Sequence, residues 1–382
     1  MSWLKRKLFG KKISITVIGA GNAGCRVGDL IVQKLKENDI NVRSLAINQV
    51  DNFTPQIDNF SDKYWFGRKE SSSNGEINEV MKVLESKDYE LKDKLEKVVF
   101  YKSSDTRRED EDHKALHLIV GSGGGTGAAV SMLAGKMIKD ITGDPPTIVF
   151  IAPEKDESSL IQYNAAKALH FLGFDFKGPY SPILLFDNEK LLKKFEEESL
   201  AEALKQSNNL LADTLTTTIL FSLQESNHEE YNADLNDFFT AFGKEATGIG
   251  IIIAMDKEYD EIEKVQNLRF SDLFFSELDE NSSLTADVTR AKRGYLTITT
   301  PLSAQTTFET RKIEKRFEKG SIKISLTTVE EPILSIRGVL TGIHPDYVDR
   351  FWEILEAGRD SRKYILDQEE TIRKSYLELK ID

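Results

Sequence analysis

The chain has 382 residues, long enough for two domains in one compact body, and its 51 basic and 63 acidic residues give a formal net charge of −12. This acidic balance argues against general nucleic-acid binding, which requires a basic face, and the single cysteine excludes an intramolecular disulfide and a Cys-x-x-Cys pair for zinc. With neither a secretory leader nor a long apolar span, the sequence predicts a soluble cytoplasmic protein.

Residues 1–12 differ from the rest of the chain in their charge. They contain five basic residues and no acidic one, together with the large apolar side chains of Trp3, Leu4, Leu8 and Phe9. A short basic amphipathic segment can lie on an anionic membrane surface, here the inner face of the cell membrane. It can equally be a helix that docks on its own protein, or a loose tail. The sequence leaves these three interpretations open.

The first motif that suggests a ligand is a glycine-rich turn at residues 19–24. A β-branched run at 13–18 predicts a strand, the sequence Gly-Ala-Gly-Asn-Ala-Gly follows, and a helix is expected from about 25 to 36. Alone, this G-x-G-x-x-G motif is typical of a dinucleotide-binding Rossmann domain. In that pattern an acidic residue ends the second strand, whereas Asn48 comes there in this sequence. We expect Cys25 to be buried and unreactive.

A second glycine-rich turn, at residues 121–127, changes that interpretation. It reads Gly-Ser-Gly-Gly-Gly-Thr-Gly and follows a predicted strand at 115–120, with a predicted helix at 130–141 behind it. Strand, turn and helix in this order present backbone N–H groups and a helix N-terminus to an anion. We expect its glycines to supply positive φ angles and to let a phosphate approach closely, with the hydroxyl of Thr126 beside it. A dinucleotide needs one such turn, so two turns favour a nucleoside triphosphate.

The remaining pattern predicts an α/β fold in two parts with a long helix between them. Strands alternate with helices up to residue 186, which predicts a doubly wound, mostly parallel sheet. Ligands bind at the carboxyl ends of such strands, where Asn48, Glu157 and Asp187 fall. Residues 191–224 then predict a helix long enough to cross the molecule.

Beyond that helix the sequence predicts an α+β region. A buried strand is expected at 248–255, and strands at 294–300, 321–328 and 333–341 are expected to form a second, mixed sheet. Helices are expected at 347–355 and 368–379. The predicted divisions of the chain are a basic extension at 1–12, a nucleotide-binding domain at 13–190, a central helix region at 191–228 and a smaller domain at 229–382.

With these parts in place, the chain resembles the tubulin/FtsZ superfamily. Residues 123–127 (Gly-Gly-Gly-Thr-Gly) match the core of its glycine-rich signature, and the turn at 19–24 lies at the right distance upstream. Residues 232–237 (Asn-x-Asp-x-x-Asp) are similar to the catalytic loop of FtsZ, while 186–188 and 163–166 look most like the archaeal CetZ group. The resemblance implies a Rossmann-like GTPase domain joined by a long central helix to a smaller α+β domain.

The resemblance also implies a ligand, GTP or GDP with Mg²⁺, and a set of residues that bind it. Along the α- and β-phosphates it places Gly21, Asn22, Ala23 and Gly24, and around the β- and γ-phosphates Gly123, Gly124, Gly125, Thr126 and Gly127. The remaining members are Asn48 beside the phosphates and Mg²⁺, Ser72 and Ser73 at the γ-phosphate, Glu157 at the ribose, Asn208 and Arg26 at the base, and Asp187.

Some positions depart from the pattern of the superfamily. Leu204 stands where FtsZ has an aromatic residue that stacks on the base, and Arg26 stands where relatives carry Asn, Gln or Lys. Ala129 replaces a common glycine, and the glycine-rich γ-phosphate loop of FtsZ has become residues 68–73. These departures predict an altered nucleotide affinity rather than loss of the site.

The function that the resemblance implies is GTP hydrolysis by a filament in cell division or cell shape. Subunits would assemble head to tail, and Asn232, Asp234 and Asp237 of one subunit would complete the active site of the next. The simpler interpretation is that residues 232–237 cap a helix beginning near Phe238, but one cap needs one such residue, so the spacing of three favours catalysis. Two other functions stay open, a nucleotide-dependent scaffold without turnover and a Rossmann oxidoreductase that uses the first turn alone.

Overall fold

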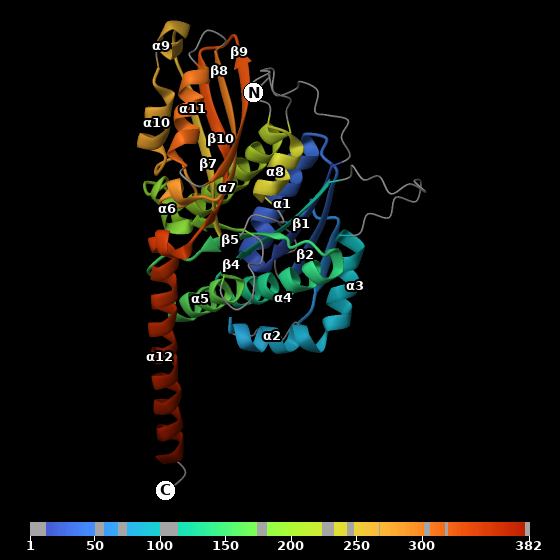
Figure 1. The fold of residues 1–382 in the computed structure, drawn as a ribbon. Coiled ribbons are helices and arrows are strands. Elements are labelled where there is room, and N and C mark those ends of the chain that lie inside the picture. Colours follow the sequence, from blue (N-terminus) through green and yellow to red (C-terminus); the bar gives the residue numbers. More distant parts are fainter. Residues whose placement is uncertain are drawn as a thin grey trace, which may run out of the picture.

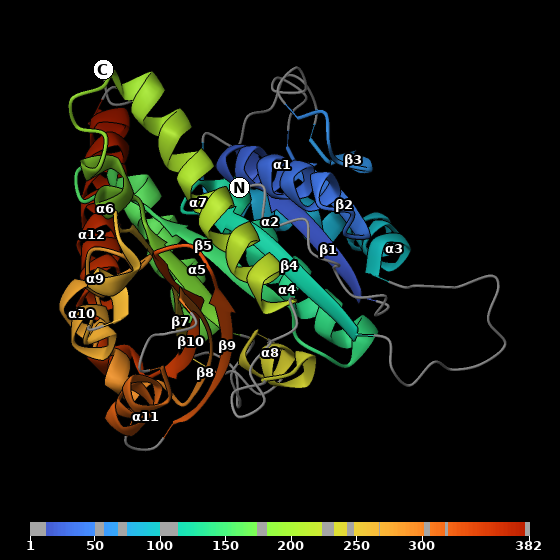
Figure 2. The same cartoon turned by 90° about the horizontal axis from the view of Figure 1, so that it is seen from above.

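The structure is a computed structural model that describes residues 13–49, 57–67, 75–99, 114–173, 182–223, 233–242, 248–266, 268–301, 306–317 and 320–378. Within these residues the strands form one ten-stranded sheet (Figures 1 and 2). In spatial order they are β3 (Asp62–Trp65), β2 (Val42–Asn48), β1 (Ile13–Ala20), β4 (Lys114–Ser122), β5 (Thr147–Ala152), β6 (Ile183–Asp187), β7 (Ile249–Glu258), β10 (Ile333–Ile343), β8 (Arg293–Pro301) and β9 (Ser321–Val329).

The sheet is parallel from β3 to β7, and this part positions the ligand-binding edge. Each of β1, β4, β5 and β6 has a β-branched or leucine-rich sequence that is buried on both faces, as parallel strands with helices on each side require. Because the strands run in the same direction, the segments that follow β1, β2, β4, β5 and β6 all emerge at one edge.

Helices cover both faces of the sheet (Figures 1 and 2). One face packs against α1 (Gly21–Glu37), α7 (Leu200–Ser222) and α8 (Leu235–Phe242). On the other side of the sheet lie α2 (Ile77–Ser86), α3 (Asp88–Val99), α4 (Gly125–Thr142), α5 (Ser159–Gly173), α9 (Ile262–Gln266), α10 (Phe270–Glu277), α11 (Thr306–Arg316) and α12 (Asp349–Glu378). Of these, α2 packs mainly on α4 and α12 mainly on α5. The short α6 (Asn188–Lys193) follows β6 directly.

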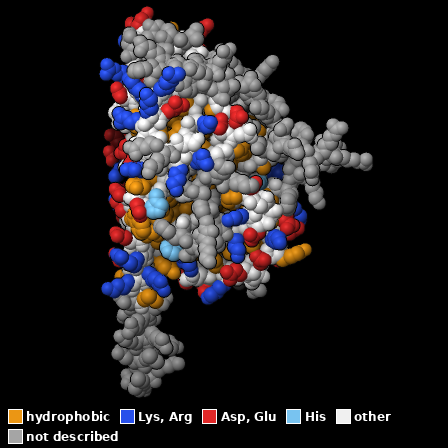
Figure 3. All heavy atoms as spheres, in the orientation of Figure 1, with side chains coloured by type: hydrophobic (Ala, Val, Ile, Leu, Met, Phe, Trp, Pro, Cys, Tyr) orange, Lys and Arg blue, Asp and Glu red, His pale blue; other side chains and the backbone are white. Residues whose placement is uncertain are grey.

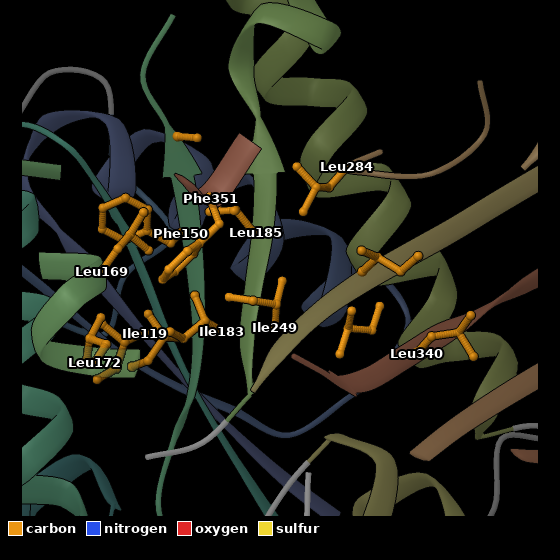
Figure 4. Packing of buried hydrophobic residues seen from close by; sticks show 14 of the residues in the cluster. Ile119, Phe150, Leu169, Leu172, Ile183, Leu185, Ile249, Leu284, Leu340 and Phe351 are labelled. Atoms are coloured by element: carbon orange, nitrogen blue, oxygen red, sulfur yellow. The ribbon is translucent and has the colours of Figure 1, made fainter. Parts of the chain in front are cut away.

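The core under α5 and α12 shows how distant parts of the chain are joined. Phe150 of β5, Leu169 of α5 and Leu185 of β6 meet Phe351 of α12 in one buried cluster (Figure 4). All four side chains are less than 2 % exposed, and fully burying a Leu or Phe side chain contributes about 1.5–3 kcal/mol. The first turns of α12 are therefore fixed to the body, whereas the rest of this helix extends past it (Figure 1).

The structure corrects the expectation of a second sheet. The strands beyond residue 248 join the first sheet, because β7 pairs in parallel with β6 through Ile183–Ile249 and Leu184–Gly250. The prediction that these later strands pair in both directions is confirmed, since β10 is antiparallel to β7 and β8 whereas β8 and β9 are parallel. The two helices expected near the C-terminus are one helix, α12, and the long helix expected from residue 191 is interrupted between α6 and α7.

Candidate functional site: a cavity between two glycine-rich turns

The carboxyl edge of the parallel strands holds a cavity of about 680 Å³. It is lined by most of the ligand-binding residues that the sequence predicted, namely Gly21, Asn22, Ala23, Arg26, Asn48, Gly123, Gly124, Gly125, Thr126, Gly127, Glu157 and Asn208. These residues come from α1, β2, α4, the segment after β5 and α7, and they are brought together by the parallel strands. The volume lies within the range of cavities that bind small molecules.

The first glycine-rich turn is packed directly against the second. Gly21 has a φ of +68°, which favours glycine. A Cβ atom on Gly21 would also lie only 2.7 Å from the backbone nitrogen of Gly127. Gly24, in contrast, does not line the cavity, because it lies against β4, where a Cβ would come within 2.1 Å of the carbonyl oxygen of Val120. Gly24 thus allows α1 to approach the sheet closely.

The second turn keeps its glycines for space rather than for positive φ, which corrects the expectation from sequence. Gly124 has φ −63° and ψ 149°, an ordinary extended conformation, and α4 begins at the next residue. A Cβ on Gly125 would lie 2.3 Å from the carbonyl oxygen of Gly75. A Cβ on Gly124 would meet only the Ser122 hydroxyl, at 3.9 Å, so this position opens onto the cavity.

Both helices that begin at the cavity are suited to an anion. The first backbone N–H groups of a helix have no partner within the helix and carry partial positive charge. Neither α1 nor α4 has an acidic residue in its first turn, and neither is capped by a side chain. Thr126 adds a partly exposed hydroxyl at the start of α4. Two helix N-termini therefore offer backbone donors to the same space.

Asn48 adds fixed polar atoms between the two turns. Its side chain is 6 % exposed, and its Nδ2 atom donates to Oδ1 of Asn22 at 2.6 Å. Its own Oδ1 accepts from the backbone nitrogen of Gln49 at 2.9 Å. The first bond joins the side-chain amides of Asn48 and Asn22, and the second fixes the orientation of Asn48. In the Rossmann pattern a carboxylate would stand at the position of Asn48.

The cavity is also lined by α7 and by the segment after β5. Leu204 and Asn208 of α7 and Glu157 of that segment are lining residues. Oε1 of Glu157 accepts from the backbone nitrogen of Glu154 at 3.3 Å, and burial raises the pKa of the Glu157 carboxyl above its ordinary value. A partly buried carboxylate and an amide in one cavity can accept and donate hydrogen bonds to a polar ligand.

Several predicted residues are not placed in the cavity. Asp187 lies outside its lining, and its carboxylate is bound to Arg350, with Nε donating to Oδ1 at 3.3 Å. Ser72, Ser73 and Asn232 lie outside the described residues. The cavity also has a second group of polar lining residues that the sequence analysis did not assign, which are Gln49, Ser122, Ser158 and Asn188. Each lies within a few residues of the end of a parallel strand, which was the signal available in the sequence.

Asp234 and Asp237 lie far from the cavity, beyond the C-terminal end of α7. Asn208 is in the first half of α7, and the 14 residues to Ser222 at its end correspond to about 21 Å. The hydroxyl of Tyr295 donates to the carbonyl oxygens of Ser222 and Ala233, so α8 begins beside that end of α7. Within one chain these carboxylates therefore cannot reach a ligand in the cavity.

The two aspartates form a reciprocal cap on α8. Oδ1 of Asp234 accepts from the backbone nitrogens of Asn236 at 2.7 Å and Asp237 at 3.0 Å. Oδ2 of Asp237 accepts in return from the backbone nitrogen of Asp234 at 3.1 Å. This is the capping-box arrangement, which requires two side chains three residues apart. Contrary to the expectation from sequence, the cap of α8 uses both aspartates, so their spacing alone does not favour catalysis.

Cys25 is buried beside the first turn, and we expect it to be unreactive in the folded protein. Its thiol is 3 % exposed and contacts the carbonyl oxygens of Gly19 and Ile47 at 3.4 and 3.7 Å. Burial raises the pKa of this thiol to about 12, so the reactive thiolate is scarce at neutral pH. A thiol reagent should label the native protein very slowly and the urea-unfolded protein quickly. Rapid labelling of the native chain would contradict this placement.

Comparison with known proteins finds the same fold in several solved structures. No protein-family model and no curated protein matches the sequence. The solved structure of CetZ2 from Haloferax volcanii, a GTPγS-bound protofilament, is 17 % identical, with 92 % of this chain and 99 % of that chain covered at a TM-score of 0.74. TubZ of Bacillus thuringiensis serovar israelensis, in a GTPγS-form protofilament, is 15 % identical, with 100 % and 97 % covered at 0.72.

An empty FtsZ dimer of M. jannaschii is also similar, at 19 % identity with 90 % of each chain covered and a TM-score of 0.61. These three structures share the order of parts seen in this chain over nearly their whole length. The chain therefore has the tubulin/FtsZ fold, as the sequence motifs predicted.

Proposed function

We propose that this chain, which has the fold of CetZ, TubZ and FtsZ, is a GTP-binding and GTP-hydrolysing member of the same superfamily that assembles head to tail into filaments. The observation that carries the proposal is the cavity of about 680 Å³ in which both glycine-rich turns meet. The solved CetZ2 and TubZ structures are GTPγS-bound or GTPγS-form protofilaments. We further propose that the filament acts in cell division or cell shape, the role that the resemblance of the sequence motifs to the superfamily implies.

The geometry fits a nucleoside triphosphate better than a dinucleotide. Both turns and two helix N-termini line one cavity, so they can bind one chain of phosphates along its length. The open space at Gly124 is the place where a phosphate oxygen would lie against the backbone. Among the other lining residues, Asn208 would bind the guanine edge, Glu157 the ribose, and Arg26 would lie near the base.

Mg²⁺ is part of the proposal because a triphosphate is bound with a divalent cation. Among the described residues there is no group of three or more His, Cys, Asp or Glu side chains that could hold a metal ion by itself. The fitting site is therefore one shared with the phosphates, beside Asn48 and Thr126, which supply neutral oxygens. Mg²⁺ usually binds through few protein ligands together with substrate phosphates. Its chemistry there would be to neutralise charge that develops on the phosphates.

Hydrolysis would require a second copy of the chain. The carboxylates of Asp234 and Asp237 are separated from the cavity by the part of α7 that follows Asn208, so they would approach the nucleotide of the next subunit. Asp234 is exposed and Asp237 partly exposed, as residues that face a neighbouring subunit must be in the isolated chain. A repeating head-to-tail contact of this kind generates an open filament. Asn232 would help to orient this loop.

A nucleotide-dependent scaffold without turnover is the second candidate, and the capping box favours it. Both aspartates already have a structural role, and Asp237 also lies 3.7 Å from the ammonium group of Lys323.

Two measurements on the purified chain test these functions. Co-purified GTP or GDP is expected, whereas NAD or FAD would support the oxidoreductase. Release of phosphate during assembly is expected. Filaments that bind GTP but release no phosphate would instead support the scaffold without turnover.

Nucleic acid is not among the proposed partners. On the face shown in Figure 3, basic and acidic side chains of the described residues are interspersed rather than separated into a basic surface. The proposed partner is a second copy of the chain.

The proposed location is the cytoplasm, with residues 1–12 as a proposed membrane contact. No helix in the described ranges is long and apolar enough to span a bilayer. Residues 1–12 lie outside the described part of the chain, so their five basic residues remain a sequence-based argument. Each basic residue near an anionic surface contributes about 1 kcal/mol.

We therefore expect the full chain to sediment with phosphatidylserine vesicles at low salt and a chain lacking residues 1–12 to stay in the supernatant. Neutral phosphatidylcholine vesicles serve as the control, because they lack the charge that the basic residues would recognise. Equal sedimentation of the two chains would refute the membrane contact.

A further inference from the structure

Arg350 joins the start of α12 to the ends of two central strands. Its side chain is 7 % exposed, and Nε donates to Oδ1 of Asp187 at 3.3 Å. Nη1 donates to Oε2 of Glu353 at 3.1 Å, and Nη2 donates to the carbonyl oxygen of Pro153. One guanidinium group thus fixes the segment after β5 and the end of β6 to the C-terminal helix, using the rigid fork that distinguishes Arg from Lys.

The two strand ends that Arg350 binds, at Pro153 and Asp187, carry or adjoin residues that line the cavity. Pro153 is a lining residue and begins the segment that carries Glu157, while Asn188, the residue after Asp187, is another lining residue. Other contacts also hold these segments, because Ala152 pairs with Asp187 between β5 and β6 and Lys155 lies 3.1 Å from Glu353 of α12. Nδ2 of Asn188 lies 3.4 Å from Oε1 of Glu154, whose backbone nitrogen donates to Glu157. Arg350 is the side chain that binds both strand ends at once, so the position of this wall of the cavity depends in part on it.

The charges around Arg350 give it a second effect on the same wall. Asp187 and Glu189 lie against it, and Oε2 of Glu189, 3.8 Å from Nη2, is buried and makes no hydrogen bond within the described part of the chain. Burial raises the pKa of the Asp187 carboxyl, and Arg350 partly offsets this shift. Without the guanidinium these carboxylates would repel each other, and the strand ends that carry them would move apart.

We propose that Arg350 is a positioning residue for the nucleotide cavity, holding the wall formed by Pro153, Glu157 and Asn188 through its bonds to Pro153 and Asp187. This inference rests on the proposed binding of a guanine nucleotide. It goes beyond that function because it couples α12, a helix that lines no part of the cavity, to the affinity for the nucleotide. Arg350 acts through other residues and does not line the cavity.

The test compares Arg350→Lys with Arg337→Lys in the full-length chain. Arg337 is the matched control, because it is a largely buried arginine, 14 % exposed, that does not line the cavity. It donates to Asp256 and Thr217 and lies over the ring of Phe221. Both variants should lower the free energy of unfolding. At a temperature at which both are folded, the dissociation constant for GDP should rise about tenfold in Arg350→Lys, as for loss of one charge-assisted hydrogen bond, and stay unchanged in Arg337→Lys.

The remaining outcomes separate the ways in which the inference can fail. Unchanged GDP affinity in folded Arg350→Lys would overturn the role of Arg350, and so would an equal loss in both variants, which would indicate a general effect of stability. If Arg350→Lys does not fold, Asp187→Asn keeps the shape and an accepting oxygen but removes the charge. It should then bind GDP about threefold more weakly, and wild-type affinity would refute the inference. A wild-type chain that binds no GDP or GTP would overturn the proposed function itself.

Discussion

Replacing Gly124 with valine should abolish most nucleotide binding while the protein stays folded. The backbone at Gly124, with φ −63° and ψ 149°, is one that valine adopts without strain. The added Cβ would meet only the Ser122 hydroxyl at 3.9 Å, so the side chain would occupy the cavity where we place a phosphate. Loss of two charge-assisted hydrogen bonds at about 1.5 kcal/mol each corresponds to about a 100-fold rise in the dissociation constant for GTP.

Gly135 and Gly125 of α4, the helix that Gly124 precedes, provide the controls for this experiment. A Cβ on Gly135 would be in ordinary contact, 3.6 Å from Ile148, so Gly135→Ala should leave both folding and GTP affinity intact. A Cβ on Gly125 would lie 2.3 Å from the carbonyl oxygen of Gly75, so Gly125→Ala should lower stability as well as affinity. Titration calorimetry and thermal unfolding together separate these effects. Wild-type GTP affinity in folded Gly124→Val would exclude the second turn as a phosphate site.

Replacing Asp237 with asparagine should slow GTP hydrolysis by about 100-fold or more, as expected when a general base is lost. Asparagine is chosen because Oδ2 of Asp237 accepts a hydrogen bond from the backbone of Asp234. The amide oxygen of the substituted side chain can accept the same bond, so the cap of α8 is kept while the carboxylate is removed. GTP binding should be unchanged, and filaments of the variant should persist longer.

The control for this variant is Asp62→Asn. Asp62 also accepts a backbone hydrogen bond, from Lys63 at 2.8 Å, and pairs with a lysine, Lys94, at 2.7 Å. It lies on β3 at the far edge of the sheet, so its loss should not change the rate of phosphate release. Phosphate release by assembled Asp237→Asn at the wild-type rate would remove this residue from catalysis and leave the capping box as its role.

The parallel half of the fold could be predicted from sequence because its signals are local. Short apolar runs ending in glycine-rich turns specify strand, turn and helix at residues 13–36 and 115–141, and the rule for parallel sheets places both turns at one edge. The same rule brought Asn48 and Glu157 to the cavity. Asn208 came from the resemblance to the superfamily, because its position depends on how α7 packs across the strands.

The parts that the sequence did not predict depend on long-range contacts or on details of the backbone. β6 and β7 pair at two positions, Ile183–Ile249 and Leu184–Gly250, and this pairing joins the later strands to the first sheet. So short a pairing leaves no recognisable pattern in the sequence. Asp187 ends a strand at the ligand-binding edge, but an arginine 163 positions later in the chain binds its carboxylate. The spacing of Asp234 and Asp237 suits a capping box and a catalytic pair equally, and only the hydrogen bonds show that the cap is formed.

The shared active site is the central claim, and the rate of GTP turnover per molecule at increasing protein concentration tests it most directly. Each subunit would need the α8 segment of a neighbour, because its own lies beyond the far end of α7. Turnover per molecule should therefore be low in dilute, monomeric protein and rise steeply once filaments form, as judged by light scattering on the same samples. Turnover that stays constant with concentration, from protein shown to be monomeric by ultracentrifugation, would contradict the claim.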